Sequence, residues 1–329
     1  MTLARDETES GQDGAADLDR DRSALLLKVA QRYYEQNRTQ EDIGRELHLT
    51  RWKIGRLLDE ARAAGIVQIA VVHPQARRTE LEIAMRARFG LRECVVVPTP
   101  ENPDPGHGHV GTAAADYLRA NASSITSLGV SWGNTLQQIA AVLPAGWTRG
   151  IDVIQINGGV SRSVKPTTAA NVAMSIAHSG DGRATLLPVP AIVEHVGTKE
   201  ALYREGFVTE VLEKGRQADA LLFSLGAIGP SSVLVQSGAV TVAELDRLQA
   251  DGACGDVVAH YITADGSVAD TDIEARTVGL TLDDLRAARR AIAVAAGADK
   301  ARIITAALTS GLCSVLITDE EAARHVLED

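Results

Sequence analysis

Four side chains within residues 50–56 have the chemistry of a DNA-contacting surface. Arg51, Lys53 and Arg56 supply cations that neutralise phosphates, and the ring of Trp52 can contact a thymine methyl group in a major groove. On a helix with about 100° per residue, Trp52 and Arg56 project from the same side, with the other two cations on the flanks. We therefore predict double-stranded DNA as a partner; the alternative is a small helical unit with a solvated charged face.

A second candidate site follows an apolar strand, within residues 128–136. Gly133 lets the backbone come close to a ligand, and the hydroxyl groups of Ser131 and Thr135 offer hydrogen bonds. The segment then opens a helix, whose free N–H groups favour an anion. We predict a phosphate-binding loop made of Ser131, Trp132, Gly133, Asn134 and Thr135; an ordinary strand-to-helix turn with a threonine cap is the alternative.

Two further segments offer polar groups to the same ligand. Asn157, Gly158 and Gly159 end another apolar strand and are predicted to line the same crevice; a tight turn with positive φ is the alternative. Lys300 stands at the start of a predicted helix, where the helix dipole disfavours a cation. A ligand phosphate, a carboxylate partner or exposure to solvent would each account for this lysine. Asp256 is placed to bind sugar hydroxyls or to cap a turn.

No group of residues in the sequence points to catalysis or to a bound metal. His107 and His109 form a His-x-His pair in a loop rich in proline and glycine, without an identifiable third ligand. His195 has no nucleophile motif beside it. The three cysteines are far apart and form no Cys-x-x-Cys pair, so we expect no metal, no cofactor and a reducing compartment.

The DNA-contacting side chains need a rigid support, which the apolar residues around them predict. Ile43 and Leu47 lie four residues apart and share one face of a helix, and Thr50 is the predicted N-cap of the next helix. That next helix buries the side opposite the cations: Ile54, Leu57, Leu58 and Ala61. Residues 39–58 therefore predict a helix-turn-helix. Three residues at helix starts join the DNA-contacting set: Thr39, Gln40 and Thr50.

Segments on either side complete this unit. Residues 23–37 are predicted as a supporting first helix with Ser23 as its N-cap. Residues 65–72 have strand character and form either a wing strand or a strand that joins the next domain, and Pro74 marks a break. We predict a winged-helix-like DNA-binding domain over residues 23–74.

From residue 75 onward, strand and helix candidates alternate. A helix is predicted over residues 76–90. The predicted strands are residues 93–97, 125–130, 151–156, 184–189, 220–225, 290–294 and 314–317. The predicted helices between and after them are residues 111–121, 135–142, 167–178, 199–203, 209–216, 242–250, 299–308 and 319–327. This alternation predicts an α/β domain with a mainly parallel sheet over residues 75–329. Residues 256–269, with a turn signal at 264–266, are predicted as a hairpin insertion.

Composition and charge fit one basic module on an acidic body. The chain has 329 residues, of which 45% are hydrophobic and 3% aromatic, so aliphatic side chains must fill a substantial core. The net charge is −10, yet residues 45–56 carry a net charge of +3. Residues 1–22 carry a net charge of −4 and are predicted as a disordered acidic lead. No apolar run of about 18 residues and no secretory signal occur, so we expect no membrane span and a cytoplasmic location.

Several motifs together resemble the SorC family of sugar-binding bacterial transcriptional regulators, which is also grouped with certain DeoR-type proteins. The resemblance covers the chain from about residue 23 to its end and lies in TQEDIG (39–44), LLDEARAAGIV (57–67), GVSWGNT (129–135), QINGG (155–159), GD (255–256), GADK (297–300) and LITDE (316–320). The chain departs from the family at residues 50–53, where many members carry small hydroxyl residues and a Ser-Arg pair. The operator sequence therefore does not carry over.

The resemblance implies a Rossmann-like effector domain similar to ribose-5-phosphate isomerase and glucosamine-6-phosphate deaminase, one that has lost catalysis and kept a sugar-phosphate pocket. It implies that residues 131–135 hold the phosphate and that Asp256 and Lys300 face the sugar. It also implies assembly into dimers or tetramers, with an effector that alters how the protein engages its operator.

We therefore predict a DNA-binding repressor of a carbohydrate or polyol catabolic operon, controlled by a phosphorylated sugar or polyol. The alternative is a sugar-phosphate isomerase or deaminase with an appended DNA-binding module, which would need a positioned general base. A third hypothesis is a constitutive DNA-binding protein whose large domain only oligomerises. The sequence shows no acid–base group as clear as the phosphate loop, so we expect a protein that is not an enzyme.

Overall fold

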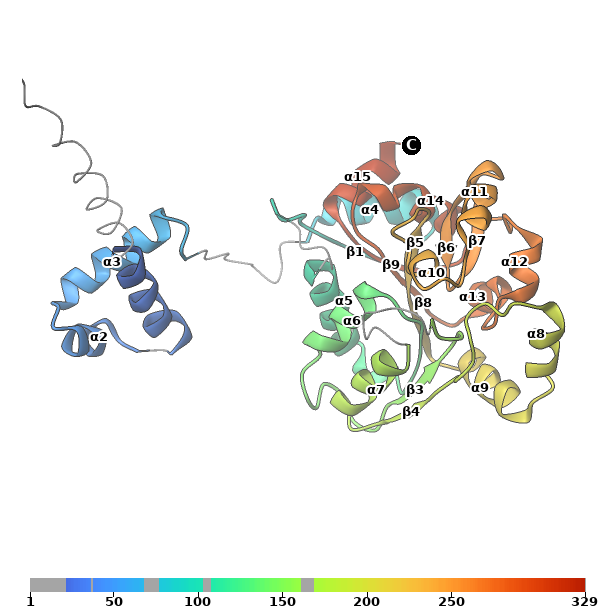
Figure 1. The fold of residues 1–329 in the computed structure, drawn as a ribbon, viewed down its shortest axis with the longest axis horizontal. Helices are drawn as coiled ribbons and strands as arrows, with labels where there is room; N and C mark the ends of the chain where they lie inside the picture. The colour runs from blue at the N-terminus through green and yellow to red at the C-terminus, as the bar shows by residue number, and fades with distance from the viewer. Residues whose placement is uncertain (1–21, 37, 68–76, 103–107, 161–168, 329) are drawn as a thin grey trace, which may run out of the picture. The chain divides into compact units, whose positions relative to one another are not determined.

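The computed structural model describes residues 22–36, 38–67, 77–102, 108–160 and 169–328. The chain divides into two compact units, residues 1–73 and 74–329, and each unit is considered by itself (Figure 1). The acidic lead predicted over residues 1–22 lies outside the described residues except for Arg22. Within the described part of the chain, every helix is too short or too polar to cross a bilayer.

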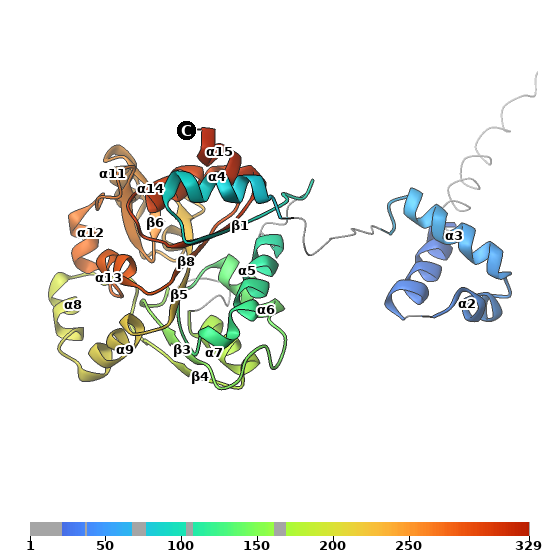
Figure 2. The same ribbon diagram turned by 180° about the vertical axis from the view of Figure 1, so that it is seen from behind.

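The N-terminal unit is a group of short helices (Figure 2). Residues 22–30 form a first helix that continues into a π-helical turn, η1 (Gln31–Glu35), and is followed by α2 (Gln40–Leu47) and α3 (Arg51–Ala63). Their apolar faces meet in one core: Leu26, Val29, Ala30, Ile43, Ile54, Leu57, Leu58 and Ala61. The four residues predicted as buried on α3 all lie in this core, so the predicted helix-turn-helix is confirmed.

Hydroxyl caps and one close backbone approach set the turn between α2 and α3. The side-chain oxygens of Thr39 and Thr50 each accept a hydrogen bond of 3.2 Å from the N–H three residues further on. The N-cap predicted for Thr50 is therefore confirmed. A Cβ atom on Gly44 would lie 2.6 Å from the carbonyl oxygen of Leu49, so glycine at this position lets the turn fold back onto α2.

The ends of this unit differ from the prediction in two details. Ser23 follows Arg22 inside the first helix, so the prediction that it is the N-cap is wrong. After α3, Gly65 takes a φ of 73° and residues 65–67 form a turn rather than the start of a strand. The rest of the predicted wing or joining strand, residues 68–72, lies outside the described residues.

The C-terminal unit is built on a parallel sheet with the strand order β1-β9-β8-β5-β2-β3-β4 (Figure 1). Its strands are β1 (Glu93–Val97), β2 (Ser127–Val130), β3 (Asp152–Gln155), β4 (Arg183–Thr185), β5 (Ala220–Ala227), β8 (Ala291–Val294) and β9 (Val315–Asp319). Each predicted strand overlaps one of these, and the mainly parallel sheet is confirmed. β5 lies at the centre, between β8 and β2.

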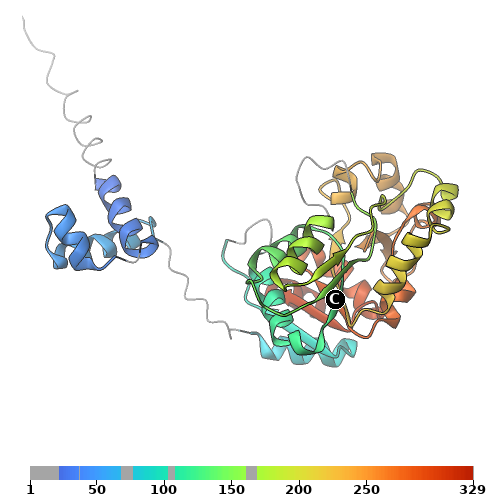
Figure 3. The same ribbon diagram turned by 90° about the horizontal axis from the view of Figure 1, so that it is seen from below.

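Helices cover both faces of the sheet because the strands alternate apolar side chains between two cores. In β5, Leu222 points into one core and Leu221 and Phe223 point into the other. The first core is closed by α5 (Gly108–Ala120), α6 (Asn134–Val142) and α7 (Ala169–Ser179). The second is closed by α4 (Thr79–Phe89), α9 (Gly206–Arg216), α13 (Leu282–Ala287), α14 (Ala301–Thr309) and α15 (Glu320–Glu328). In Figure 3 the green helices and the yellow α9 lie on opposite sides of the sheet.

The remaining helices show where the helix predictions hold and where they fall short. α11 (Val242–Ala250) has the predicted bounds, and α8 (Val196–Leu202) begins three residues before its prediction. Three short helices were not predicted: α10 (Val233–Gln236), α12 (Thr271–Arg276) and α13. They have four to six residues each, too few for a helical period to stand out in a sequence.

An antiparallel hairpin extends the end of β5 and forms a small layer above the sheet. β6 (Ala253–Val257) pairs with the end of β5 and with β7 (His260–Thr263). The predicted turn at residues 264–266 is confirmed: after it, Val268 bridges antiparallel to Ile262, and the N–H of Ala269 donates to the carbonyl oxygen of Tyr261. The preceding turn, between β6 and β7, was not predicted. This turn is Val258–Ala259, which takes φ values of 54° and 73° without glycine, asparagine or aspartate.

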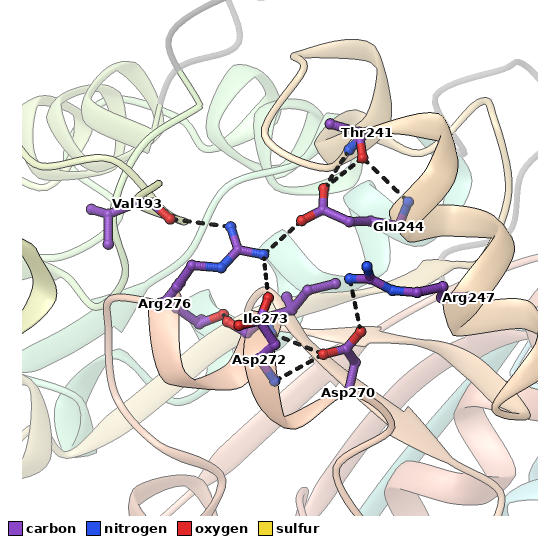
Figure 4. Close-up of polar contacts among 9 residues, drawn as sticks. Val193, Thr241, Glu244, Arg247, Asp270, Asp272, Ile273 and Arg276 are labelled. Atoms are coloured by element: carbon purple, nitrogen blue, oxygen red, sulfur yellow. Dashed lines mark hydrogen bonds and ion pairs between the residues drawn. The ribbon is translucent and has the colours of Figure 1, made fainter. Parts of the chain in front are cut away.

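A cluster of hydrogen-bonded polar side chains connects α11 (Val242–Ala250), α12 (Thr271–Arg276) and the loop before α8, as Figure 4 shows. On α12, Arg276 donates hydrogen bonds to the carboxylate of Glu244 at 2.6 Å and to the carbonyl oxygen of Val193 at 3.2 Å. Glu244 also forms a capping box with Thr241 at the start of α11. Next to it, Asp270 caps α12 and accepts a hydrogen bond from Arg247. These contacts tie α11, α12 and the loop before α8 to one another.

Candidate functional site

The outer face of α3 carries the predicted DNA-contacting residues. Arg51, Trp52, Lys53 and Arg56 are all exposed, and Trp52 keeps 69% of its surface accessible. The helix reaches this geometry because its apolar residues occupy the opposite side and pack into the core of the unit. The arrangement can present cations and an aromatic ring to a duplex.

A groove at the start of α2 adds residues that the sequence analysis did not select. It is lined by Tyr33, Tyr34, Arg38, Thr39, Gln40, Glu41 and Arg51. Of the predicted residues, Thr39, Gln40 and Arg51 lie here, and Thr39 uses its hydroxyl to cap α2. The new members are Arg38, Glu41 and the two tyrosines, whose rings meet edge to face with centroids 5.0 Å apart. The signal in the sequence was an aromatic pair and an arginine just before a helix cap.

The C-terminal half of α3 has a different electrostatic character. Asp59 and Glu60 lie there, and they form ion pairs with Arg62 and Arg22 respectively. Ion pairing with Arg22 holds the pKa of Glu60 below its usual range. The positive charge available to an anionic partner is therefore concentrated in the first two turns of α3.

In the C-terminal unit, the carboxyl ends of β2, β5 and β8 surround a cavity of about 200 Å³. The position agrees with the rule that open parallel sheets bind ligands where the connections diverge to the two sides of the sheet. Seven of the ten predicted effector-binding residues line it: Ser131, Trp132, Gly133, Asn134, Thr135, Asp256 and Lys300. Eleven further residues line it as well: Ser224, Leu225, Gly226, Ala227, Ser231, Ser232, Val233, Val258, Ala295, Ala296 and Asp299.

The loop between β2 and α6 is held tightly against its neighbours. The indole N–H of Trp132 donates to the carbonyl oxygen of Gly158 at 2.9 Å, and the hydroxyl of Ser224 donates to the carbonyl oxygen of Trp132 at 3.2 Å. Gly133 has a φ of 134°, and a Cβ on it would lie 2.6 Å from the hydroxyl oxygen of Ser224. Because no side chain caps α6, the first N–H groups of this helix are available to an anion in the cavity.

Lys300 and Asp256 bring opposite charges to the wall of this cavity. Lys300 is the last residue of a 3-10 turn, η3 (Ala298–Lys300), directly before α14, and its ammonium group donates to the carbonyl oxygen of Leu225 at 2.6 Å. Burial lowers the pKa of Lys300, and the nearby charge of Asp256 opposes that shift. This arrangement gives a physical reason for the lysine that the sequence placed against the helix dipole.

The carboxylate of Asp256 is fixed by the hairpin. One of its oxygens accepts a hydrogen bond of 3.2 Å from the N–H of Ala259, in the turn that takes positive φ values. Burial raises the pKa of Asp256, and the charge of Lys300 opposes that shift. A buried carboxyl beside a partly buried ammonium suits recognition of hydroxyl groups, because a carboxylate accepts hydrogen bonds and an ammonium donates them.

The three remaining predicted residues do not line the cavity. Asn157 is fully buried, and both polar atoms of its side chain lack a hydrogen-bond partner. Gly158 has its Cα against the backbone of Pro190, which leaves no room for a side chain, and its carbonyl oxygen holds Trp132. Gly159 continues this contact by bridging to Pro190. The prediction that these residues share the crevice is therefore wrong for the described cavity, and they instead support its wall.

The serines of the cavity wall were missed by the sequence analysis. Ser224 lies in β5, and Ser231 and Ser232 follow a Gly-Pro pair before α10. The signal was an apolar strand that ends in small residues, the same signal that marked residues 131–135.

The described residues include only one member of the His-x-His pair. His107 lies outside the described residues, and His109 lies 3.3 Å from the buried carboxylate of Asp319. Burial would raise the pKa of Asp319, but hydrogen bonds from His109, Ala322 and Gly297 hold it below its usual range. Among the described residues, no group of three metal-binding side chains occurs, and all three cysteines are buried thiols.

Comparison with known proteins gives one consistent relationship. The Sugar-bind family model, a sugar-binding domain, matches residues 73–328. The deoxyribonucleoside regulator of Bacillus subtilis (strain 168) is 31% identical over 314 residues, which are 95% of this chain and 100% of that protein. The transcriptional regulator LsrR of Klebsiella pneumoniae is 30% identical over 310 residues, which are 92% of each protein.

A solved structure shows the same relationship over nearly the whole chain. The full-length sorbitol operon regulator SorC from Klebsiella pneumoniae has a TM-score of 0.69 and 26% sequence identity to this chain. The match covers 93% of this chain and 99% of that chain. Both units are therefore included in the likeness.

Proposed function

The chain belongs to the SorC-type family of sugar-binding transcriptional regulators, and we propose that it represses a carbohydrate or polyol catabolic operon until a phosphorylated sugar or polyol binds. The family membership makes the chain a transcriptional regulator. The proposal adds that the regulation is repression, that the effector carries a phosphate, and which residues hold each partner. We also propose that the protein acts in the cytoplasm, where its DNA is.

One observation carries this proposal most directly. The chain has an exposed cationic helix face in one unit and, in the other unit, a cavity of about 200 Å³ at the carboxyl ends of a parallel sheet. The first suits the phosphates and base edges of a duplex. The second suits a small ligand with an anionic group.

The cavity supports a phosphorylated effector through its charge and its backbone. The start of α6, which has no side-chain cap, and the ammonium of Lys300 offer donors and positive charge to a phosphate. The carboxyl of Asp256 and the hydroxyl groups of Ser224 and Ser232 offer partners to sugar hydroxyls. The names of the relatives, which refer to deoxyribonucleosides and to sorbitol, support a sugar or polyol as the ligand class.

We propose that the effector alters operator binding through the assembly of the protein. In a dimer or tetramer, two DNA-binding units would dock on the half-sites of a palindromic operator. An effector that favours one arrangement of the subunits then changes operator affinity, and operator binding must change effector affinity by the same factor.

The cavity supports binding better than turnover. Its ionisable side chains, among the described lining residues, are Asp256, Asp299 and Lys300. An isomerase or deaminase needs a general base placed at the substrate carbon. The ammonium of Lys300 donates to a backbone carbonyl and the carboxyl of Asp256 accepts from a backbone N–H, so both are fixed in the wall and keep further hydrogen-bonding capacity for a bound ligand.

A ligand screen followed by an operator assay tests the proposal. The full-length protein is heated with a panel of phosphorylated sugars and polyols and with their unphosphorylated counterparts. We expect a phosphorylated member to raise the melting temperature and to release the protein from operator DNA. Stabilisation by unphosphorylated sugars alone would contradict the phosphate, and no effect of any ligand on operator binding would contradict effector control.

A further inference from the structure

Two side chains on the exposed face of α3 are positioned as one unit. The guanidinium carbon of Arg56 lies 5.1 Å from the centre of the Trp52 ring, within the range of a cation–π contact. The two residues are four positions apart and are therefore neighbours on one face of the helix. Trp52 remains 69% exposed, so its ring can meet another molecule while it contacts Arg56.

The charge along α3 indicates which part of the helix meets DNA. The first two turns carry Arg51, Lys53 and Arg56 without an acidic residue, and the acidic Asp59 and Glu60 come only afterwards. Phosphates attract the first group and repel the second. The Trp52–Arg56 pair therefore lies on the part of the recognition helix whose side chains reach base edges in a major groove.

The contact between the two side chains matters for recognition. A guanidinium held against a ring samples fewer rotamers than a free arginine, so less conformational entropy is lost when it binds. Its N–H groups match the O6 and N7 atoms of guanine in a bidentate contact, and an apolar ring matches the methyl group of thymine. Because Trp52 and Arg56 touch each other, the bases that they contact should be neighbours.

We infer that Trp52 and Arg56 together determine operator specificity by selecting a G·C pair that is adjacent to a T·A pair in each half-site. Arg56 contacts the guanine, and Trp52 contacts the thymine methyl group. This inference rests on the proposed DNA binding and adds the base pairs that are selected. Lys53 and Arg51, on the flanks of the same face, contact phosphates and carry no sequence information.

Selection of duplexes from a randomised pool tests the guanine contact. The full-length protein without effector should enrich half-sites in which guanine and thymine are neighbours. Arg56→Lys keeps the charge but loses the planar fork, so discrimination at the guanine position should fall by about 5- to 150-fold, a larger loss than that of binding to random duplex. Lys53→Ala is the matched control, which should weaken binding to all sequences alike and keep the preferred bases.

Replacing the selected thymine with deoxyuridine tests the tryptophan contact, because this change removes only the methyl group. Wild-type protein should lose affinity for the deoxyuridine duplex, and Trp52→Ala should bind the two duplexes equally. Trp52→Ala should also weaken the guanine preference, because Arg56 loses its support. Trp52 is exposed, so this variant is expected to fold, and its melting temperature checks that.

The outcomes separate this inference from the proposed function. An enriched motif without adjacent guanine and thymine would refute the inference and leave DNA binding intact. So would an Arg56→Lys variant that keeps the guanine preference, or a methyl effect that persists in Trp52→Ala. If wild-type protein enriches no duplex at all, both the inference and the proposed operator binding are wrong.

Discussion

The two candidate sites of this protein are built in opposite ways. The DNA-contacting face consists of exposed side chains that lie within two turns of one helix, α3. The cavity in the other unit is assembled from the ends of β2, β5 and β8 and from the β6–β7 hairpin, and of its charged pair Asp256 is buried and Lys300 is partly buried. Residues on the exposed face should be replaceable one at a time, whereas residues of the cavity are coupled to each other and to the fold.

Loss of Lys300 is expected to have the largest effect. Lys300→Ala removes the cation that faces both the ligand space and Asp256, so effector affinity should fall by about 100-fold or more while operator binding is kept. Calorimetric titration with the effector and an operator-binding assay measure the two quantities. Arg302→Ala, an exposed position on the same helix, is the control that should change neither. Equal losses of effector and operator binding in the Lys300 variant would contradict the separation of the two sites.

A methyl group at Gly133 is expected to have the next largest effect. Gly133→Ala forces a Cβ to within 2.6 Å of the Ser224 hydroxyl at a φ of 134°, so it should cost about 1–3 kcal/mol of unfolding free energy and abolish effector binding. Urea unfolding and ligand-induced thermal shifts measure this. Gly146→Ala is the matched control, since its φ is 72° but nothing lies within 4 Å of the added atom. That variant should show the backbone strain alone, with effector binding intact.

Removal of one cation from the exposed face should have a smaller effect. Lys53→Ala deletes one phosphate contact, which should lower operator affinity by about 5- to 10-fold near 0.1 M salt and reduce the slope of log K against log salt by about 0.9. Binding measured over a salt series gives both numbers. Effector affinity and unfolding free energy should stay at the wild-type values, because the side chain is exposed. A change in effector affinity of this variant, measured without DNA, would contradict the independence of the exposed face and the cavity.

The polar cluster around Glu244 is expected to give the smallest effect, and one that depends on pH. Burial raises the pKa of Glu244, but hydrogen bonds from Thr241 and Arg276 outweigh burial and hold it below its usual range. Its contribution to stability is therefore present above the usual glutamate pKa of about 4.3 and is lost as the pH falls through the lowered value. Glu244→Gln should cost about 1 kcal/mol in urea unfolding at pH 7 and progressively less in acid. A cost that does not change with pH would mean that the carboxylate charge contributes nothing.

Sequence patterns predicted the strands of the parallel sheet better than the turns and loop contacts that depart from regular structure. The strands of the parallel sheet follow from short apolar runs, because a strand buried on both faces shows them directly. The β6–β7 turn was missed because Val258 and Ala259 carry none of the residue types that signal a turn, yet both take positive φ. Asn157 and Gly158 were assigned to the ligand because they end a strand. In the structure both residues lie behind the wall of the cavity, and Gly158 packs against Pro190.

Local sequence was sufficient for the helix-turn-helix, its cap at Thr50, and the cationic face of α3, because each depends on residues within a few positions of one another. The cavity required long-range information. Lys300 meets the carbonyl oxygen of Leu225, and Trp132 meets that of Gly158, across strands that are adjacent in space and distant in the chain. Spacing in a sequence fixes the direction of a side chain on its own helix, but only the pairing of the strands brings such partners within hydrogen-bond reach.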